Sequence, residues 1–111
     1  MRHISQLVAA TVSISFIALT LTGFVRAQND AEKQYKTHCV LCHAPDGSGS
    51  SPSGKALKAQ DLRSELIQKK TDAELATAIT KGKGKMPAFG KKLKPEDITQ
   101  LVAYIRALPK K

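Results

Sequence analysis

The chain has few cysteines, few aromatic side chains and few acidic ones. Its 111 residues include two cysteines, two tyrosines, three phenylalanines and no tryptophan, and 9 Asp+Glu stand against 18 Lys+Arg. A chain of this length forms one domain, which excludes a multidomain enzyme or a barrel. A disulfide between Cys39 and Cys42 would close too small a loop to stabilise the fold much. Because domains this small usually need a metal or a cofactor in their core, the composition predicts such a component.

The N-terminal segment has the pattern of a secretory leader. The first 27 residues contain no acid, and residues 4–25 carry no charge. In Val25-Arg26-Ala27, Val25 and Ala27 are the small or apolar residues that a signal peptidase requires, and cleavage is expected after Ala27. We therefore expect residues 1–27 to be a cleaved signal peptide and residues 28–111 to be the mature domain, exported to the periplasm. The alternative is a retained membrane anchor, since about 20 apolar residues can span a bilayer.

Capping patterns and periodicity predict an all-α fold of about four to five short helices. The segment Asn29–Glu32 reads as a capping box that opens a helix over 30–38. Asp61 is a candidate cap for a short helix that carries Leu62, Leu66 and Ile67. A second capping box, Thr71–Glu74, opens a helix that Gly82 is placed to end.

The strongest helix signal lies at the end of the chain. Pro95 suits a first helical position, and Pro109 stops the helix. Apolar residues recur between them at three- to four-residue spacing: Ile98, Leu101, Val102, Ile105 and Leu108. Two long loops, 43–54 and 82–90, remain, and loops of this kind suggest something for them to enclose.

Cys39, Cys42 and His43 form the pattern C-x-x-C-H, which is the haem attachment pattern of c-type cytochromes. At the end of a helix, residues three apart face the same side, so both thiols can add to the vinyl groups of one porphyrin. His43 then lies under the iron. A redox dithiol would need a βαβ context, and a zinc site would need a fourth ligand, for which His38 is the remaining candidate. The sequence predicts one covalent haem c with His43 as an iron ligand.

Met86 is the methionine that remains beyond the leader, and it is the predicted second iron ligand. A methionine usually fills a core, but Met86 lies in a polar loop of glycines and lysines. Pro87 biases it towards an extended conformation. A thioether opposite histidine at haem iron raises the reduction potential. His38 is the competing ligand, and we interpret it as a surface histidine.

These motifs resemble those of class I monohaem c-type cytochromes of the small bacterial, c6-like type. The resemblance rests on residues 39–43, on residues 84–89 and on the terminal helix with Tyr104, and it covers roughly residues 30–108. It implies that the first and last helices cross next to the haem, with Tyr35 and Tyr104 near the crossing.

The resemblance also implies a second interaction at the iron ligand. A loop proline, Pro52 or its rival Pro45, would accept a hydrogen bond from His43 through its carbonyl and orient the ring. Where many relatives have glycine at the tight helix crossing, this chain has Ala31.

The predicted function is that of a soluble exported electron carrier and not of an enzyme. Six-coordinate iron leaves no open site for a substrate, and no acid–base pair or nucleophile stands near the motif. Two alternatives stay open. The chain could be an electron-transfer subunit of a dehydrogenase or oxidase complex, or a haem sensor whose Met86 is displaced by a ligand.

Basic side chains surround Met86 in the sequence. They are Lys81, Lys83, Lys85, Lys91, Lys92 and Lys94. Such a field attracts acidic redox partners such as a reductase, a dehydrogenase or a terminal oxidase. Nucleic acid is a poor fit, because no basic–aromatic interleaving is present. An anionic membrane surface is a secondary candidate, and the chain is expected to be a monomer.

Overall fold

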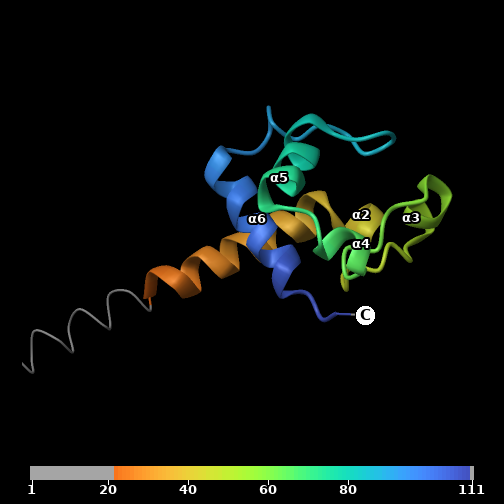
Figure 1. The fold of residues 1–111 in the computed structure, drawn as a ribbon. Coiled ribbons are helices and arrows are strands. Elements are labelled where there is room, and N and C mark those ends of the chain that lie inside the picture. The colour runs from red at the N-terminus through yellow and green to blue at the C-terminus, as the bar shows by residue number, and fades with distance from the viewer. Residues whose placement is uncertain (1–21, 111) are drawn as a thin grey trace, which may run out of the picture.

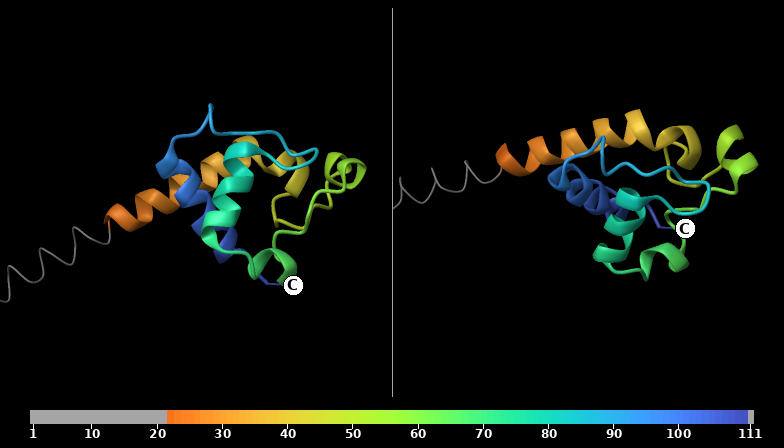
Figure 2. Two further views of the ribbon diagram at one scale, coloured as in Figure 1. Left: turned by 45° about the horizontal axis from the view of Figure 1, so that its top comes forward. Right: turned by 90° about the horizontal axis from the view of Figure 1, so that it is seen from above.

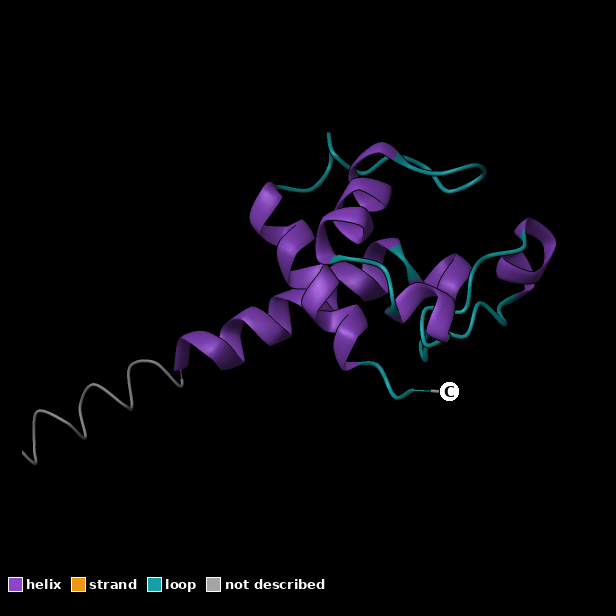
Figure 3. Cartoon of the chain, in the orientation of Figure 1, coloured by secondary structure: helices purple, strands orange, loops and turns teal. Residues whose placement is uncertain are grey.

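The computed structural model describes residues 22–110, and this part of the chain consists of helices and loops without a sheet (Figure 1, Figure 3). Residues 22–38 are helical and are called the first helix below. The helices that follow are α2 (Val40–His43), α3 (Pro52–Leu57), α4 (Glu65–Gln68), α5 (Asp72–Lys81) and α6 (Pro95–Ala107). The predicted all-α fold is confirmed.

The first helix and α6 cross at the centre of the molecule (Figure 1, Figure 2). Tyr35 on the first helix is 1% exposed, and Leu101 on α6 is fully buried. The rings of Tyr35 and Tyr104 lie with their centroids 4.9 Å apart. Ala31, one turn before Tyr35, is also buried. The crossing that the sequence resemblance implies is therefore present, and both tyrosines lie at it.

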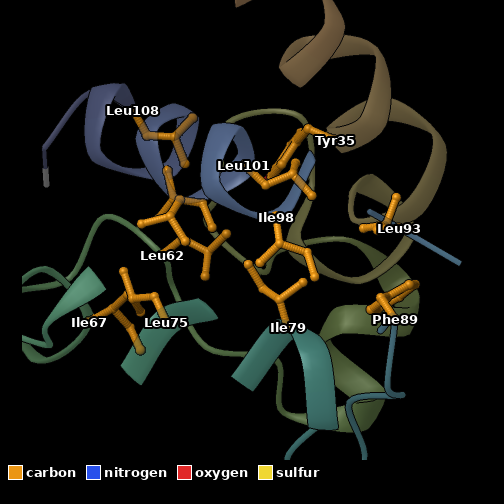
Figure 4. Close-up of a cluster of buried hydrophobic side chains, with 12 residues drawn as sticks. Tyr35, Leu62, Ile67, Leu75, Ile79, Phe89, Leu93, Ile98, Leu101 and Leu108 are labelled. Atoms are coloured by element: carbon orange, nitrogen blue, oxygen red, sulfur yellow. The ribbon is translucent and has the colours of Figure 1, made fainter. Parts of the chain in front are cut away.

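The core lies between this crossing and α5 (Figure 4). Its buried side chains are Tyr35, Leu62, Ile67, Leu75, Ile79, Phe89, Leu93, Ile98, Leu101, Val102, Ile105 and Leu108. All five apolar positions predicted for the last helix and its end belong to this cluster. Burying this stripe, at roughly 25 cal/mol per Å² of apolar surface, is what holds α6 in place.

The predicted start of the first helix is wrong. Asn29 does not cap it, because residues 22–28 are already helical. Residues 24–28 contain no glycine or proline, so the capping pattern lies inside a segment where nothing interrupts the backbone hydrogen bonds. Residues 1–21 of the predicted signal peptide lie outside the described residues. None of the helices within residues 22–110 has the length and apolar character needed to cross a membrane.

The short helix in the middle of the chain also begins differently from the prediction. α4 follows Ser64 and not Asp61. The Asp61 carboxylate instead accepts hydrogen bonds from the Arg63 backbone N–H at 2.9 Å and from Arg63 Nε at 3.0 Å. Leu62 and Ile67 are buried as expected, but Leu66 is 66% exposed. The carboxylate therefore caps a turn before the helix, which is a common alternative use of aspartate.

The boundaries of α5 are as predicted. The Thr71 hydroxyl accepts from the Glu74 backbone N–H at 3.1 Å, and the Glu74 carboxylate accepts from the Thr71 N–H at 2.7 Å. The hydrogen bond from the Thr71 backbone N–H is the largest of the effects that lower the pKa of Glu74. Gly82 ends the helix at a φ of 74°, and Pro95 opens α6 at the first turn, as expected.

Arg106 ties α6 to the junction between α4 and α5. Its Nη1 donates to the Gln68 carbonyl at 2.7 Å, and its Nε donates to the Asp72 carboxylate at 3.0 Å. Its Nη2 also donates to the Lys70 carbonyl. Hydrogen bonds from a charged donor to backbone carbonyls are each stronger than neutral ones. They fix the junction that carries one wall of the site described next.

Candidate functional site

A cavity of about 1120 Å³ lies beside the core, and its wall is mainly apolar. Cys39, Cys42, His43 and Met86 all line it. Further walls come from α5 and from the chain between α3 and α4. The volume lies slightly above the usual range of about 300–1,000 Å³ for small-molecule sites, which suits a large cofactor. The fold thus brings all four residues singled out in the sequence to one space.

His43 presents its ring with one nitrogen already committed. His43 Nδ1 lies 3.0 Å from the Gln60 backbone carbonyl oxygen. Since a carbonyl can only accept, Nδ1 carries the proton and Nε2 keeps its lone pair for a metal. Burial, which is the larger effect, lowers the pKa of His43 and favours the neutral ring that metals bind. The acceptor is therefore Gln60, and the expectation of Pro52 or Pro45 was wrong.

The loop after His43 satisfies the last carbonyls of α2. The Ser51 hydroxyl lies 2.7 Å from the Leu41 carbonyl oxygen and 3.0 Å from the Cys42 carbonyl oxygen, and these two acceptors share its one proton. The Gly49 N–H donates to the His43 carbonyl at 2.8 Å. Helix ends leave such carbonyls without partners inside the helix. The glycine- and serine-rich composition of this loop thus has a local structural cause.

The helix α3, which the sequence did not predict, packs its backbone directly on α2. Ser51 caps it by accepting from the Gly54 N–H at 3.0 Å, and Pro52 fills its first turn. A Cβ on Gly54 would lie 2.0 Å from the Cys42 carbonyl oxygen. Only glycine permits this approach, so Gly54 sets how close α3 comes to the attachment segment.

No disulfide joins Cys39 and Cys42, and both are partly buried. Burial, with a smaller contribution from Cys42, raises the pKa of the Cys39 thiol to about 11. Redox-active dithiols instead have a thiol whose pKa is lowered. The environment of Cys39 therefore lacks the thiolate stabilisation that is typical of a dithiol redox centre.

Met86 ends a two-residue hairpin turn. The Lys83 N–H donates to the Met86 carbonyl at 3.1 Å, and the Met86 N–H donates to the Lys83 carbonyl at 3.0 Å. Gly84 occupies the turn with a φ of 59°, as turns of this size require. The Phe89 N–H then donates to the Ile79 carbonyl of α5 at 2.9 Å. The loop that carries Met86 is therefore held at both ends.

We expect Gly82→Ala to loosen this loop. Gly82 has a φ of 74°, and an added Cβ would lie 2.6 Å from the Met86 carbonyl oxygen. The conformation alone costs an alanine about 1–2 kcal/mol. The haem-loaded variant should bind added imidazole several times more tightly than the parent, as measured by spectral titration. Gly84→Ala is the control, because Gly84 shares the positive φ of Gly82 but has nothing within 4 Å of an added Cβ. It therefore carries the same kind of backbone strain without the clash, and it should raise imidazole affinity less. Equal imidazole affinity in the parent and the Gly82 variant would contradict this role for Gly82.

His38 is not the simple surface residue that the sequence suggests. Its ring is partly buried and lies edge-on to Phe89, with the centroids 5.7 Å apart. Lys92 Nζ lies 6.0 Å from the centre of the same Phe89 ring. The first helix thus contacts the loop that carries Met86 through His38, which itself is not part of the cavity wall.

The basic side chains reach the cavity in a way that the sequence shows only in part. Three of the six predicted lysines line the cavity, as their closeness to Met86 in the sequence suggests: Lys81, Lys83 and Lys85. The other three are exposed and are not part of its wall: Lys91, Lys92 and Lys94. The lining residues missed in the sequence include Gln60, Lys58 and Lys70. Gln60 acts through a backbone carbonyl, which has no residue-type signal. The two lysines come from segments that only the fold brings together.

Comparison with known proteins gives the same class as the site. Residues 26–105 match the family described as cytochrome c oxidase, cbb3-type, subunit III. The chain is 31% identical over 103 residues to cytochrome c6 of Picosynechococcus sp., covering 88% of this chain and 87% of that relative. It is 30% identical over 105 residues to cytochrome c6 of Nostoc sp., and the alignment covers 95% of this chain and 92% of that relative. The solved structure of the c-type cytochrome KustC0563 superposes with a TM-score of 0.66 at 32% identity, covering 72% of this chain and 98% of that one.

The chain therefore belongs to the c-type cytochromes, and it is of the small, c6-like kind. Covalently bound haem c is the cofactor of this family, and electron transport, not enzymatic catalysis, is its role. The cavity fits this assignment, since it places two thiols, an imidazole with a free Nε2 and a thioether around one largely apolar space.

Proposed function

We propose that this chain is a soluble, exported electron carrier with one haem c, attached through Cys39 and Cys42 and ligated by His43 and Met86. The observation that carries the proposal is the single cavity that all four residues line. When bound, the haem supplies an iron that gains or loses one electron. The attachment segment 39–43 and Met86, which are far apart in the sequence, meet at this cavity.

The residues of the site limit motion when the charge at the iron changes. Gln60 holds the ring of His43 through Nδ1, and the hairpin turn with Lys83 holds the backbone of Met86. The apolar wall excludes water, which favours the less charged state and raises the potential together with the thioether ligand. A rigid, dry site with two fixed ligands suits an electron carrier better than a sensor, which must release a ligand.

Export is part of the proposal. The uncharged stretch 4–25 and the residues before Ala27 favour removal of a signal peptide. The match to the family begins at residue 26, next to this position. The mature protein would then be residues 28–111 in the periplasm, and haem would be attached there.

Mass spectrometry of the exported protein tests attachment and processing together. The expected mass is that of residues 28–111 plus one haem. A mass without haem would overturn the proposed cofactor, and a mass that includes residues 1–27 would overturn cleavage. A ferric spectrum that keeps its sulfur–iron band when a low concentration of cyanide is added supports the carrier, whereas a high-spin spectrum supports the sensor.

Acidic redox proteins are the proposed partners, docking at the lysines around the Met86 loop. Lys81, Lys83 and Lys85 lie at the cavity wall, where electrons would enter or leave. Attraction between exposed charges is screened over about 8–10 Å at ordinary salt. Electron exchange with an acidic partner protein should therefore slow as the salt concentration rises, in stopped-flow measurements. Lys83→Glu should slow electron exchange more than Lys110→Glu, because Lys110 is exposed near the end of the chain and away from the Met86 loop in the sequence. Salt-independent rates, or equal effects of both variants, would contradict docking at this surface.

The description of the matched family favours one further candidate, an electron-transfer subunit of an oxidase complex. Sedimentation of the protein in a mild detergent extract of the whole native cells distinguishes the two. A carrier sediments as a monomer, whereas a subunit sediments with larger polypeptides.

A further inference from the structure

Ala44, which directly follows His43, has an unusual backbone conformation. Its φ is 63° and its ψ is 164°, a combination that glycine adopts almost alone because a Cβ is crowded there. Ala44 is also 4% exposed, so water does not stabilise it. Residues persist in such conformations only where the surrounding structure holds them. The neighbours of Ala44 must therefore supply that restraint.

The Tyr35 hydroxyl supplies a restraint from the first helix. Tyr35 Oη donates a hydrogen bond to the Ala44 carbonyl at 2.8 Å, and this bond is buried. The Gly47 N–H donates to the same carbonyl at 3.2 Å, and the Ala44 N–H donates to Val40 at 3.0 Å. Of these three bonds, only the one from Tyr35 comes from outside the segment 40–47. It therefore joins the residue after His43 to the helix crossing.

The ring of Tyr35 is itself fixed. It is 1% exposed and packs against the ring of Tyr104 with the centroids 4.9 Å apart. Burial raises the pKa of Tyr35, so the hydroxyl remains a donor over the ordinary pH range. Breaking the bond to the Ala44 carbonyl would leave the Tyr35 hydroxyl buried without a hydrogen-bond partner. That state costs free energy, so the bond is maintained.

We propose that Tyr35 is a positioning residue for His43: its hydroxyl holds the Ala44 carbonyl, and so the strained backbone after His43, in the orientation that aims the imidazole into the cavity. The His43 ring is held on its other side by Gln60 at 3.0 Å. Tyr35 thus fixes the backbone from which the ring projects, and Gln60 fixes the rotation of the ring. This inference rests on the proposed role of His43 as an iron ligand.

Tyr35→Phe in the haem-loaded protein tests the proposal, with Tyr104→Phe as the matched control. Both variants remove one phenol hydroxyl from the same ring pair, but only Tyr35 donates to Ala44. In Tyr35→Phe we expect the reduction potential and the NMR shifts of the His43 ring protons to change. The Gly47 amide should exchange its hydrogen up to about tenfold faster, as expected for the loss of one net hydrogen bond. Tyr104→Phe should leave all three readouts at the parent values.

Ala44→Gly provides an independent test of the strain. Glycine adopts this conformation freely, so the variant should unfold at a higher denaturant concentration than the parent. In the double variant with Tyr35→Phe, the changes in potential and in His43 shifts should be smaller than in Tyr35→Phe alone. The proposal is overturned if Tyr35→Phe lowers stability but leaves the potential and the His43 shifts unchanged. It is also overturned if Ala44→Gly is destabilising, an outcome that can be read even if Tyr35→Phe fails to fold. Absence of covalent haem from the parent protein would instead contradict the proposed function.

Discussion

Gly54→Ala is expected to reduce the yield of haem-loaded protein severalfold and to lower its free energy of unfolding by about 3 kcal/mol, the upper end of the overpacking range. The added Cβ would lie 2.0 Å from the Cys42 carbonyl oxygen and 2.5 Å from the Gly49 carbonyl oxygen. Both are backbone atoms, so no side-chain rotation relieves the clash. α3 must move away from the attachment segment, and the loop between them loses the hydrogen bonds that satisfy the end of α2.

The measurement is the ratio of haem absorbance to protein together with denaturant unfolding monitored by circular dichroism. Lys55→Ala is the matched control, since Lys55 is the next residue of α3 and is exposed. It should have a normal haem content and stability within about 0.5 kcal/mol of the parent. A Gly54 variant with parent-like haem content and stability would show that α3 does not pack on α2 in this way.

Met86→Ala should leave haem attached but lower its reduction potential by on the order of 0.2 V, a part of the ~0.8 V range that axial ligands set. The thioether stabilises ferrous iron, so its removal favours the ferric state. The sixth position should also become open to cyanide. The attachment residues Cys39 and Cys42 are far from Met86 in the sequence, and the substitution does not alter them.

Potentiometric titration and cyanide binding measure this result. Lys85→Ala, next to Met86 and exposed, removes a positive charge near the site without touching a ligand, and it should shift the potential far less. If Met86→Ala keeps a low-spin spectrum and a high potential, Met86 is not the iron ligand.

The parts of the site that the sequence predicted well are those where one residue type has one chemical use. Cys39, Cys42 and His43 are adjacent, and their spacing alone indicates haem attachment. Met86 could be singled out because its loop offers no apolar stripe for a core methionine. The structure brings these residues to one cavity, while their roles at the iron remain proposals.

The parts that failed depend on contacts between distant segments. Gln60 supports His43 with a backbone carbonyl, a group that any residue type can provide. The expected proline came from the resemblance to the family and not from a signal in the chain. α3 has six residues, and Gly54 lets it pack closely on α2, a long-range contact that the local pattern does not show. The first helix begins before Asn29, at residue 22 of the described range, because nothing in residues 24–28 interrupts the helical backbone and the capping pattern at Asn29 does not start a new helix. Local patterns therefore identified the chemical groups but not the elements that orient them.

The meeting of the two terminal helices has a consequence for the order of folding. The buried ring of Tyr35 finds its neighbours in Leu101 and Tyr104, close to the end of the chain. Contacts of such large sequence separation form slowly, because a long loop must be closed before they contribute. The first helix of the exported chain therefore gains these contacts only once α6 has folded against it. Until then the segment with both thiols stays accessible to whatever attaches the porphyrin.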